Sequence, residues 1–557
     1  MDVTRKFALA LLAAILAPLA AHAQTAQDLI DSAQNTENVL TYGMGYGQQR
    51  YSTLSQIDTR DVRQLVPVWN YSLNDNRGEE SQPLVIDGVM YVTTHNATMA
   101  IDALTGRQIW KTTIEYPAAT PRVACCGIVN RGLAAYEGKL FRTTLDDHVV
   151  AYDMKTGKQL WKSKAIDFKA GYSMTVAPLV ADGVVITGVS GGEYGIRGFL
   201  DGWDPRTGKH LWRRYTVPSP RAKGGDTWPG DTWKHGGGAT WLTGSYDPEL
   251  NLVYWGVGNP GSWNALVRKG DNLYTDSVIA IRPRTGKIVW HYQFTPNDAF
   301  DYDGTNELIL ADLKIHGKTR KILMQADRNG FFYVIDRSNG KLLAANPFVK
   351  QNWADRVDMK TGRPVKSAIT KEMYAGKQVE IWPSAFGGKN WMPMSYNPQT
   401  GLAYANTLNF GWTYQAQVPK YRAGVFYFGA KFAWAFPKEG PRGYLKAIDP
   451  LTGKSKWEIP SELPNYSGTL STAGGLVFTG TETGAFKAYD AGSGKELWSF
   501  QTGSGIVGQP ITWSHDGRQY VTITSGIGGV YALFSGDQRL AQIPAGGSVW
   551  TFALAKP

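Results

Sequence analysis

The residues with the most distinctive chemistry in this chain are two adjacent cysteines. Cys125 and Cys126 are the only cysteines among 557 residues. In an exported protein they can pair only with each other or between chains; the alternative is that both stay reduced as small buried hydrophobic side chains. A disulfide between neighbouring residues closes a very small ring, and proteins tend to keep such strain where something functional lies against it. The pair therefore marks a candidate site.

Two absences narrow the redox chemistry. A covalently attached c-type haem requires Cys-x-x-Cys-His, which this sequence lacks, so any one-electron acceptor must be a separate molecule. The run Gly236-Gly237-Gly238 is followed by turn and aromatic residues with no helix pattern. A Rossmann-type nicotinamide enzyme is therefore disfavoured.

Two arginines and two aspartates stand out for their neighbours. Arg131 and Arg328 each lie beside Asn and Gly in a predicted tight turn, which favours ligand contact over an ordinary surface arginine. Asp301 and Asp303 flank a tyrosine at the end of a predicted strand. By themselves, two acids at that position indicate only a solvated strand end.

The elements that must position these residues form a repeat. Asp-x-x-Thr-Gly is a turn in which glycine takes positive φ, and the strand that follows it carries a tryptophan. Turns of this kind lie at 102–106, 153–157, 204–208, 284–286, 449–453 and 490–494, with Trp110, Trp161, Trp212, Trp290, Trp457 and Trp498 after them. Two degenerate copies are expected at 336–340 and 397–401.

Self-similarity of this kind predicts a β-propeller. Units repeating every 40 to 80 residues or so cannot bury a hydrophobic face alone and must stack or close into a ring. If Trp69 belongs to a blade whose other strands come from the far end of the chain, the count is about eight blades. The alternative is a run of unrelated hairpins in an array of β-sandwiches.

Composition agrees with one large β domain over residues 24–557. The chain is 43% hydrophobic and 12% aromatic, with 63 Gly and 20 Trp, and no Pro- or Ser-rich linker interrupts it. The formal charge of +11 would suit an acidic or neutral partner, and equally plain solubility. Neither a nucleic-acid partner nor a membrane span is expected, and a homodimer is left open.

The N-terminus has the form of a signal peptide over residues 1–23. Arg5 and Lys6 precede an apolar run, and Ala21-His22-Ala23 before Gln24 resembles a signal-peptidase site. The apolar run is too short for a transmembrane helix. These features predict export to the periplasm.

Several motifs, in order over nearly the whole mature chain, resemble the pyrroloquinoline quinone (PQQ)-dependent alcohol dehydrogenases of the methanol and ethanol dehydrogenase family. Besides the Trp-turn repeat they are Cys-Cys-Gly-Ile-Val-Asn-Arg-Gly at 125–132, Ser-Gly-Gly-Glu at 190–193, Gly-Val-Gly-Asn-Pro at 256–260 and Asp-Tyr-Asp at 301–303. The resemblance implies an all-β, eight-bladed propeller with four-stranded antiparallel blades. It also implies oxidation of an alcohol to an aldehyde or ketone by hydride transfer to metal-bound PQQ.

The resemblance also assigns cofactor contacts. A disulfide of Cys125 and Cys126 would lie against one face of the quinone and Trp241 against the other, where a large π surface favours stacking. The other positions that match contacts of the cofactor's carboxylates and quinone oxygens are Glu80, Arg131, Thr175, Ser190, Gly191, Gly192, Arg328, Asn390 and Trp391. Trp241 could instead be one more blade-packing tryptophan.

The metal ligands that the resemblance implies are all oxygen donors: Glu193, Asn259 and Asp301, of which Asp301 is also the base that takes the alcohol proton. Asp303 departs from the calcium enzymes, which usually carry Ala, Ser or Thr there, and matches the lanthanide-dependent members. A trivalent ion favours the extra ligand and the extra negative charge. The resemblance therefore predicts a lanthanide site, with Ca²⁺ as the alternative.

The substrate and the acceptor are less defined by sequence. The aromatic-rich stretch from Asn409 to Trp434 resembles the ethanol-type and quinohaemoprotein branches, and it predicts a pocket wider than methanol needs. The resemblance implies a separate c-type cytochrome as electron acceptor. The alternatives are a calcium-dependent quinoprotein acting on sugars or polyols, and a non-enzymatic propeller scaffold.

Overall fold

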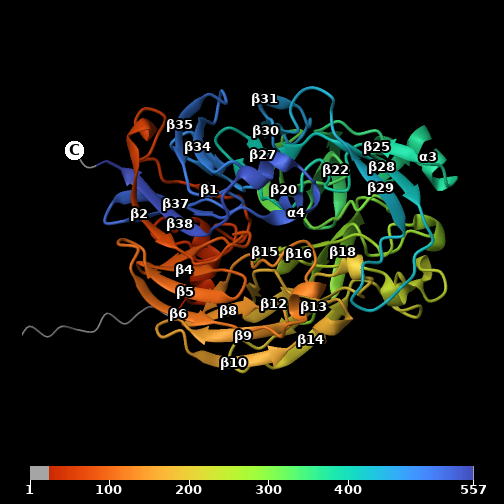
Figure 1. The fold of residues 1–557 in the computed structure, drawn as a ribbon, viewed down its shortest axis with the longest axis horizontal. Helices are drawn as coiled ribbons and strands as arrows, with labels where there is room; N and C mark the ends of the chain where they lie inside the picture. Colours follow the sequence, from red (N-terminus) through yellow and green to blue (C-terminus); the bar gives the residue numbers. More distant parts are fainter. Residues whose placement is uncertain (1–23, 556–557) are drawn as a thin grey trace, which may run out of the picture.

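The repeat of turn and tryptophan forms a repeat of antiparallel sheets in the computed structural model, which describes residues 24–555. The predicted signal peptide, 1–23, lies outside the described residues. The sheets are arranged around a common centre, and the chain runs around it from the red to the blue end of the colour scale (Figure 1). The protein is a β-propeller.

The first part of the chain forms four-stranded sheets from strands consecutive in sequence. They are β3 (Leu84–Ile86), β4 (Val89–Thr93), β5 (Ala97–Asp102) and β6 (Gln108–Thr113); β7 (Ala134–Tyr136), β8 (Lys139–Thr143), β9 (His148–Asp153) and β10 (Gln159–Lys164); β11 (Leu179–Ala181), β12 (Val184–Gly188), β13 (Phe199–Trp203) and β14 (His210–Tyr215); β15 (Ser245–Asp247), β16 (Leu252–Val257), β17 (Ser277–Ile281) and β18 (Ile288–Gln293); and β19 (Ile309–Ile315), β20 (Lys318–Ala326), β21 (Phe331–Asp336) and β22 (Lys341–Pro347).

The later sheets combine distant parts of the chain. They are β26 (Ser395–Asn397), β27 (Leu402–Leu408), β30 (Gly443–Ile448) and β31 (Ser455–Ser461); β32 (Thr469–Thr472), β33 (Leu476–Gly480), β34 (Ala485–Asp490) and β35 (Glu496–Gln501), extended by parallel β1 (Tyr51–Ser52); and β36 (Ile511–His515), β37 (Arg518–Ser525) and β38 (Ser548–Leu554), completed by β2 (Leu65–Ser72).

The last of these sheets joins the two ends of the chain. β2 carries Trp69 and pairs antiparallel with β38, and the red-orange and blue strands accordingly lie side by side in Figure 1. The prediction that the Trp69 strand takes its partners from the far end of the sequence is confirmed.

Tryptophan docking onto the next turn links neighbouring sheets. The turn at 102–106 shows how: Asp102 Oδ1 accepts from the amides of Leu104 and Thr105, and Gly106 has φ +73°. A Cβ on Gly106 would lie 2.8 Å from the Trp69 ring. The Trp69 indole donates to the Ala103 carbonyl at 2.8 Å. Only glycine therefore fits under the indole, which explains why turn and tryptophan recur together.

The same indole-to-carbonyl bond recurs around the molecule and closes it. It joins Trp110 to Met154, Trp161 to Pro205, Trp212 to Pro283, Trp290 to Arg337, Trp457 to Ala491 and Trp498 to Leu65. In β22 the position of the tryptophan is taken by Ala344, and the side-chain amide of Asn346, two residues further on, donates to the Leu451 carbonyl at 2.8 Å. The degenerate copy at 336–340 is confirmed as a β21–β22 turn.

The prediction that residues 397–401 are a degenerate copy of the repeat turn is wrong. It joins β26 to β27, the first and second strands of its sheet, whereas the repeat turn of that sheet lies at 449–453 between β30 and β31. A Cβ on Gly401 would meet nothing within 4 Å. Among residues 24–555 no indole packs on Gly401, so the Thr-Gly pair is only a local turn.

Insertions and short helices surround the sheets. β23 (Ala354–Asp358) pairs with β24 (Arg363–Lys366), and β25 (Val379–Ile381), β28 (Gly411–Ala416) and β29 (Ala430–Ala435) form a small sheet beside α3 (Ala368–Tyr374). The other α-helices are α1 (Ala26–Ile30), α2 (Thr120–Val123) and α4 (Gly529–Phe534). Within residues 24–555, no helix has the length and apolar character needed to cross a membrane.

Candidate active site

One cavity brings most of the predicted site residues together. Its volume is about 180 Å³. The predicted residues that line it are Glu80, Cys125, Cys126, Arg131, Thr175, Ser190, Gly191, Glu193, Trp241, Asp301, Asp303, Arg328, Asn390 and Trp391. The two that do not line it, Gly192 and Asn259, lie just behind: Asn259 Oδ1 is 3.1 Å from where a Cβ on Gly192 would be.

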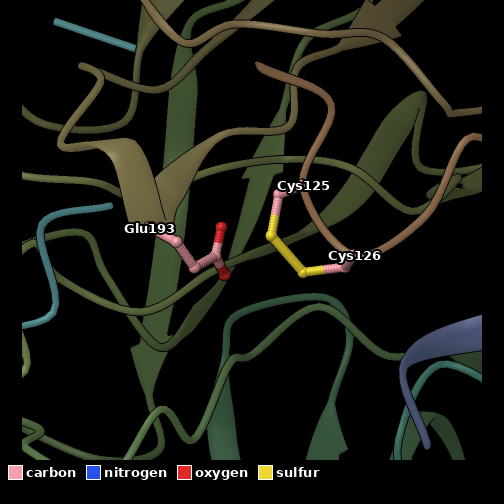
Figure 2. A group of neighbouring side chains, drawn as sticks. All are labelled: Cys125, Cys126 and Glu193. Carbon is pink, nitrogen blue, oxygen red and sulfur yellow. A yellow bond between two sulfur atoms is a disulfide. The ribbon is translucent and has the colours of Figure 1, made fainter. Parts of the chain in front are cut away.

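The two cysteines form a disulfide that lies in the wall of this cavity. They follow α2 on a loop, and Cys126 has φ +67°. Figure 2 shows the Glu193 carboxylate, from the turn at 192–194, directed toward the two sulfur atoms. A disulfide has no thiolate to offer a metal, so Glu193 is the ionisable member of this group.

One end of the cavity is a chain of polar contacts. Arg131 pairs with Glu80 at 2.7 Å and donates to Thr175 Oγ1 at 2.6 Å. The hydroxyls of Thr175 and Ser190 are 3.0 Å apart. The Arg131 guanidinium also lies over the Trp241 ring, 4.8 Å from its centroid. Arg131 therefore connects the Glu80 carboxylate, the Thr175 hydroxyl and the Trp241 indole.

The other end is acidic and is held together by Arg328. This arginine pairs with Asp301 at 3.2 Å and with Asp303 at 2.9 Å. Asp303 also accepts from the backbone amide of Asn259 at 2.6 Å and from the Trp241 indole at 3.2 Å. A Cβ on Gly258 would lie 2.4 Å from Asp303 Oδ1, so glycine is required for this approach.

Burial raises the pKa of two acids that line the cavity, Glu193 and Asp301. The pKa of Glu193 rises to about 7, first because of burial and then because of the Asp303 charge. Burial also raises the pKa of Asp301 well above its usual value, opposed by Arg328 and reinforced by Asp303 and Glu193. A cation among these oxygens would offset the cost of ionising them.

Buried polar atoms without partners test whether a charged ligand fits here. Asp301 Oδ1, Arg131 Nε and Arg328 Nε are buried and make no hydrogen bond within the part of the chain that the structure describes. Such atoms are costly to leave unpaired. An oxygen-seeking cation at Asp301 and a polyanionic planar ligand between the two arginines would satisfy them, so the residues fit a quinone cofactor with a hard metal ion.

Asn390 and Trp391 line the cavity and are held by local contacts. The Asn390 amide donates to the Phe386 carbonyl at 2.9 Å, and Asn390 Oδ1 accepts from the Trp391 amide at 2.8 Å. The Arg131 guanidinium lies 5.1 Å from the Trp391 ring centroid. Trp391 thus faces the arginine, and Asn390 holds the backbone beside it.

An aromatic wall was only partly anticipated from sequence. The remaining lining residues are Trp263, Ala385, Phe386, Phe426, Phe428, Phe432, Trp434, Val530 and Phe534. The aromatic stretch at 409–434 indicated four of them. Phe534 lies on α4, between β37 and β38 and outside the repeat, so no sequence pattern indicated it. The Phe534 carbonyl accepts a hydrogen bond from the Trp434 indole at 2.9 Å.

Comparison with known proteins identifies the family. Residues 40–347 and 430–521 match the PQQ family described as the β-propeller domain of glucose, ethanol and alcohol dehydrogenases. The chain belongs to this family of quinoprotein alcohol dehydrogenases.

Named relatives of this quinoprotein alcohol dehydrogenase cover nearly all of it. The quinoprotein alcohol dehydrogenase PedH of Pseudomonas putida is 42% identical over 98% of this chain and 96% of its own. The lanthanide-dependent methanol dehydrogenase of Methylacidiphilum fumariolicum is 43% identical over 88% of this chain and 84% of its own. The structure of a europium-containing methanol dehydrogenase superposes with a TM-score of 0.91 at 39% identity, covering 95% of this chain and 100% of that one.

Proposed function

We propose that this enzyme oxidises alcohols to aldehydes or ketones at a PQQ held in the described cavity beside a lanthanide ion. We further propose that it works in the periplasm, that its propeller has eight blades, and that a separate c-type cytochrome takes the electrons. The observation that carries the proposal is the meeting, in one cavity, of the disulfide, the Arg131 network and the acids around Arg328. When bound, PQQ supplies a hydride-accepting carbonyl and the metal supplies Lewis acidity.

The residues of this chain would hold the ligand from four sides. Glu80, Arg131, Thr175 and Ser190 offer charge-assisted and hydroxyl hydrogen bonds to carboxylates. The disulfide and the Trp241 indole would contact the two faces of the flat ring. Glu193, Asn259, Asp301 and Asp303 offer oxygen atoms to the ion.

Asp301 would act as the base. Its Oδ1 is buried and unpaired, while Oδ2 is tied to Arg328. Oδ1 is therefore the atom free to accept the hydroxyl proton of an alcohol. The aromatic wall would exclude water from this position and contact the substrate's carbon chain, so we expect alcohols larger than methanol to bind.

Asp303 is the residue on which the choice of metal depends. With calcium, Glu193, Asn259 and Asp301 would be the protein ligands, and Asp303, a third carboxylate, would add more negative charge than a divalent ion offsets. A trivalent ion offsets that charge. The similarity to a lanthanide-dependent and to a europium-containing methanol dehydrogenase supports the same choice.

Reconstitution tests the function. We expect protein purified without cofactor to reduce an artificial dye only when PQQ, a metal ion and an alcohol are all supplied. Omitting any one should abolish dye reduction, and NAD should not replace PQQ. Dye reduction with NAD alone would contradict the proposal, and a scan of alcohols under the same conditions would identify the substrate class.

A further inference from the structure

Asp298 lies three residues before Asp301, on the loop after β18. Its side chain is 1% exposed. One carboxylate oxygen accepts from the Phe300 amide at 2.9 Å, and the other accepts from the Tyr302 amide at 3.1 Å. A single side chain thus holds the backbone on both sides of Asp301.

The backbone at Asp301 needs such support. Asp301 has φ +65°, in the left-handed region that costs a residue with a Cβ about 1 kcal/mol or more. Without hydrogen bonds on either side, the loop would relax toward negative φ. The Asp301 carboxylate would then turn away from the cavity that it now lines.

The loop is anchored from beneath and from the side. Arg268 is fully buried and donates to the Asp298 carbonyl, to the Ser262 carbonyl at 2.7 Å and to Asn272 Oδ1 at 2.8 Å. On the other side, the Tyr302 hydroxyl donates to the Pro383 carbonyl at 2.7 Å. Arg268 therefore holds the backbone of Asp298, and the Asp298 carboxylate in turn holds the two backbone amides on either side of Asp301.

We propose that Asp298 is a positioning residue, which fixes Asp301 so that Oδ1 meets the alcohol and the metal while Oδ2 stays on Arg328. This inference rests on the proposed role of Asp301 as base and metal ligand. Misplacing a reacting group by about 1 Å costs about 100-fold in rate. Loss of the clamp should therefore reduce turnover without removing any group that touches the substrate.

The test compares Asp298→Ala and Asp298→Asn with Asp247→Asn as a matched control. Asp247 is also buried, accepts from a backbone amide, that of Leu250, at 3.0 Å and pairs with Arg337 at 2.7 Å, but it lies outside the cavity. Each variant is reconstituted with PQQ and metal, and kcat, KM, PQQ affinity and thermal unfolding are measured. With Eu³⁺ as the metal, luminescence lifetimes in H2O and D2O report how many waters the ion holds.

We expect kcat to fall about 100-fold in Asp298→Ala and about 10-fold in Asp298→Asn, which keeps one acceptor, with KM and PQQ affinity within about twofold of wild type. The Eu³⁺ ion should gain about one water in Asp298→Ala as Asp301 withdraws. Asp247→Asn should lose stability but keep wild-type kcat and hydration.

Three results would overturn the inference: wild-type kcat in folded Asp298→Ala, unchanged Eu³⁺ hydration, or a loss of kcat matched by Asp247→Asn. If Asp298→Ala does not fold, Asp298→Asn decides by the same measures. Asp301→Asn separates the two levels of the argument. Turnover in Asp301→Asn would refute the proposed base, whereas an inactive Asp301→Asn beside a fully active Asp298→Asn would refute only the clamp.

Discussion

At the residue scale, Asp303 joins three parts of the site, because its carboxylate contacts the Asn259 amide, the Trp241 indole and Arg328. We expect Asp303→Asn, which keeps the shape but removes the charge, to weaken activation by La³⁺ at least about tenfold. Activity is measured over a titration of La³⁺ with PQQ in excess. The control is Asp312→Asn, which removes a charge paired with Arg337 away from the cavity. An unchanged La³⁺ response in Asp303→Asn would show that this acid is not a ligand.

The disulfide gives a second prediction at this scale. Replacing both Cys125 and Cys126 by Ser should impair turnover and PQQ affinity while lowering the free energy of unfolding by only about 1 kcal/mol. The chain between them is the shortest that a disulfide can close, so little loop entropy is removed from the unfolded state. Calorimetry and cofactor titration measure the two effects. Full turnover in a variant without the disulfide would exclude a cofactor role.

At the element scale, α4 forms part of the cavity wall and is held by one acid. Asp537 accepts from Arg539 at 2.6 Å, from Arg442 at 2.5 Å and from the Tyr531 hydroxyl at 3.1 Å. Hydrogen bonds from Arg539, above all, lower the pKa of Asp537 to about 2. An acid whose pKa is lowered by folding stabilises the fold above its unfolded pKa, so this contribution is lost as pH falls from about 4 to 2.

We therefore expect Asp537→Asn to cost about 1 kcal/mol at neutral pH, since Arg539 is partly exposed and its charge is screened. The same variant should remove part of the stability loss between pH 4 and pH 2. Hydrogen exchange of the α4 amides should accelerate, because the helix loses its tie to Arg442. Equal exchange in wild type and variant would mean that α4 is held by its aromatic contacts alone.

Sequence predicted the elements whose signal is local. The Asp-x-x-Thr-Gly turn requires a glycine with positive φ, and the tryptophan of the same hairpin follows within ten residues, so the motif is visible in sequence although its indole docks on the turn of another sheet. The copy at 397–401 failed because neither it nor the genuine turn at 336–340 is followed by a tryptophan, so the two turns look alike in sequence. Family motifs located the polar cavity residues. Phe386 and Phe534 could not be predicted, since they meet Trp434 only through the tertiary fold.

At the scale of the whole molecule, the N-terminal segment contacts many sheets around the centre. The Gly43 amide donates to Gln82, Gln48 to the Thr243 carbonyl, Gln49 to the Leu310 carbonyl, and the Ser471 amide to the Arg50 carbonyl. Through these contacts the single segment 43–50 connects residues from several different sheets and their loops. The sheets are thus joined both by the indole docks and by residues 43–50.

Ring closure predicts cooperative unfolding that depends on each indole. Trp498→Ala removes the contact between β35 and the sheet that contains both ends of the chain, and we expect it to cost about 3 kcal/mol. Trp498→Phe should cost about 1 kcal/mol less than that, because ring packing is partly kept. Denaturant unfolding followed by fluorescence and circular dichroism measures both. A cost below 1 kcal/mol for Trp498→Ala would show that the indole docks are not what closes the ring.

The most direct test of the central claim, a PQQ-dependent alcohol dehydrogenase that uses a lanthanide, is a metal competition. Apoprotein is incubated with PQQ and equal concentrations of La³⁺ and Ca²⁺, unbound metal is removed, and the protein is assayed for metal content and for alcohol-dependent dye reduction. We predict close to one La per chain, little Ca, and activity that follows the La content. Protein that retains Ca and is fully active with it would contradict the account.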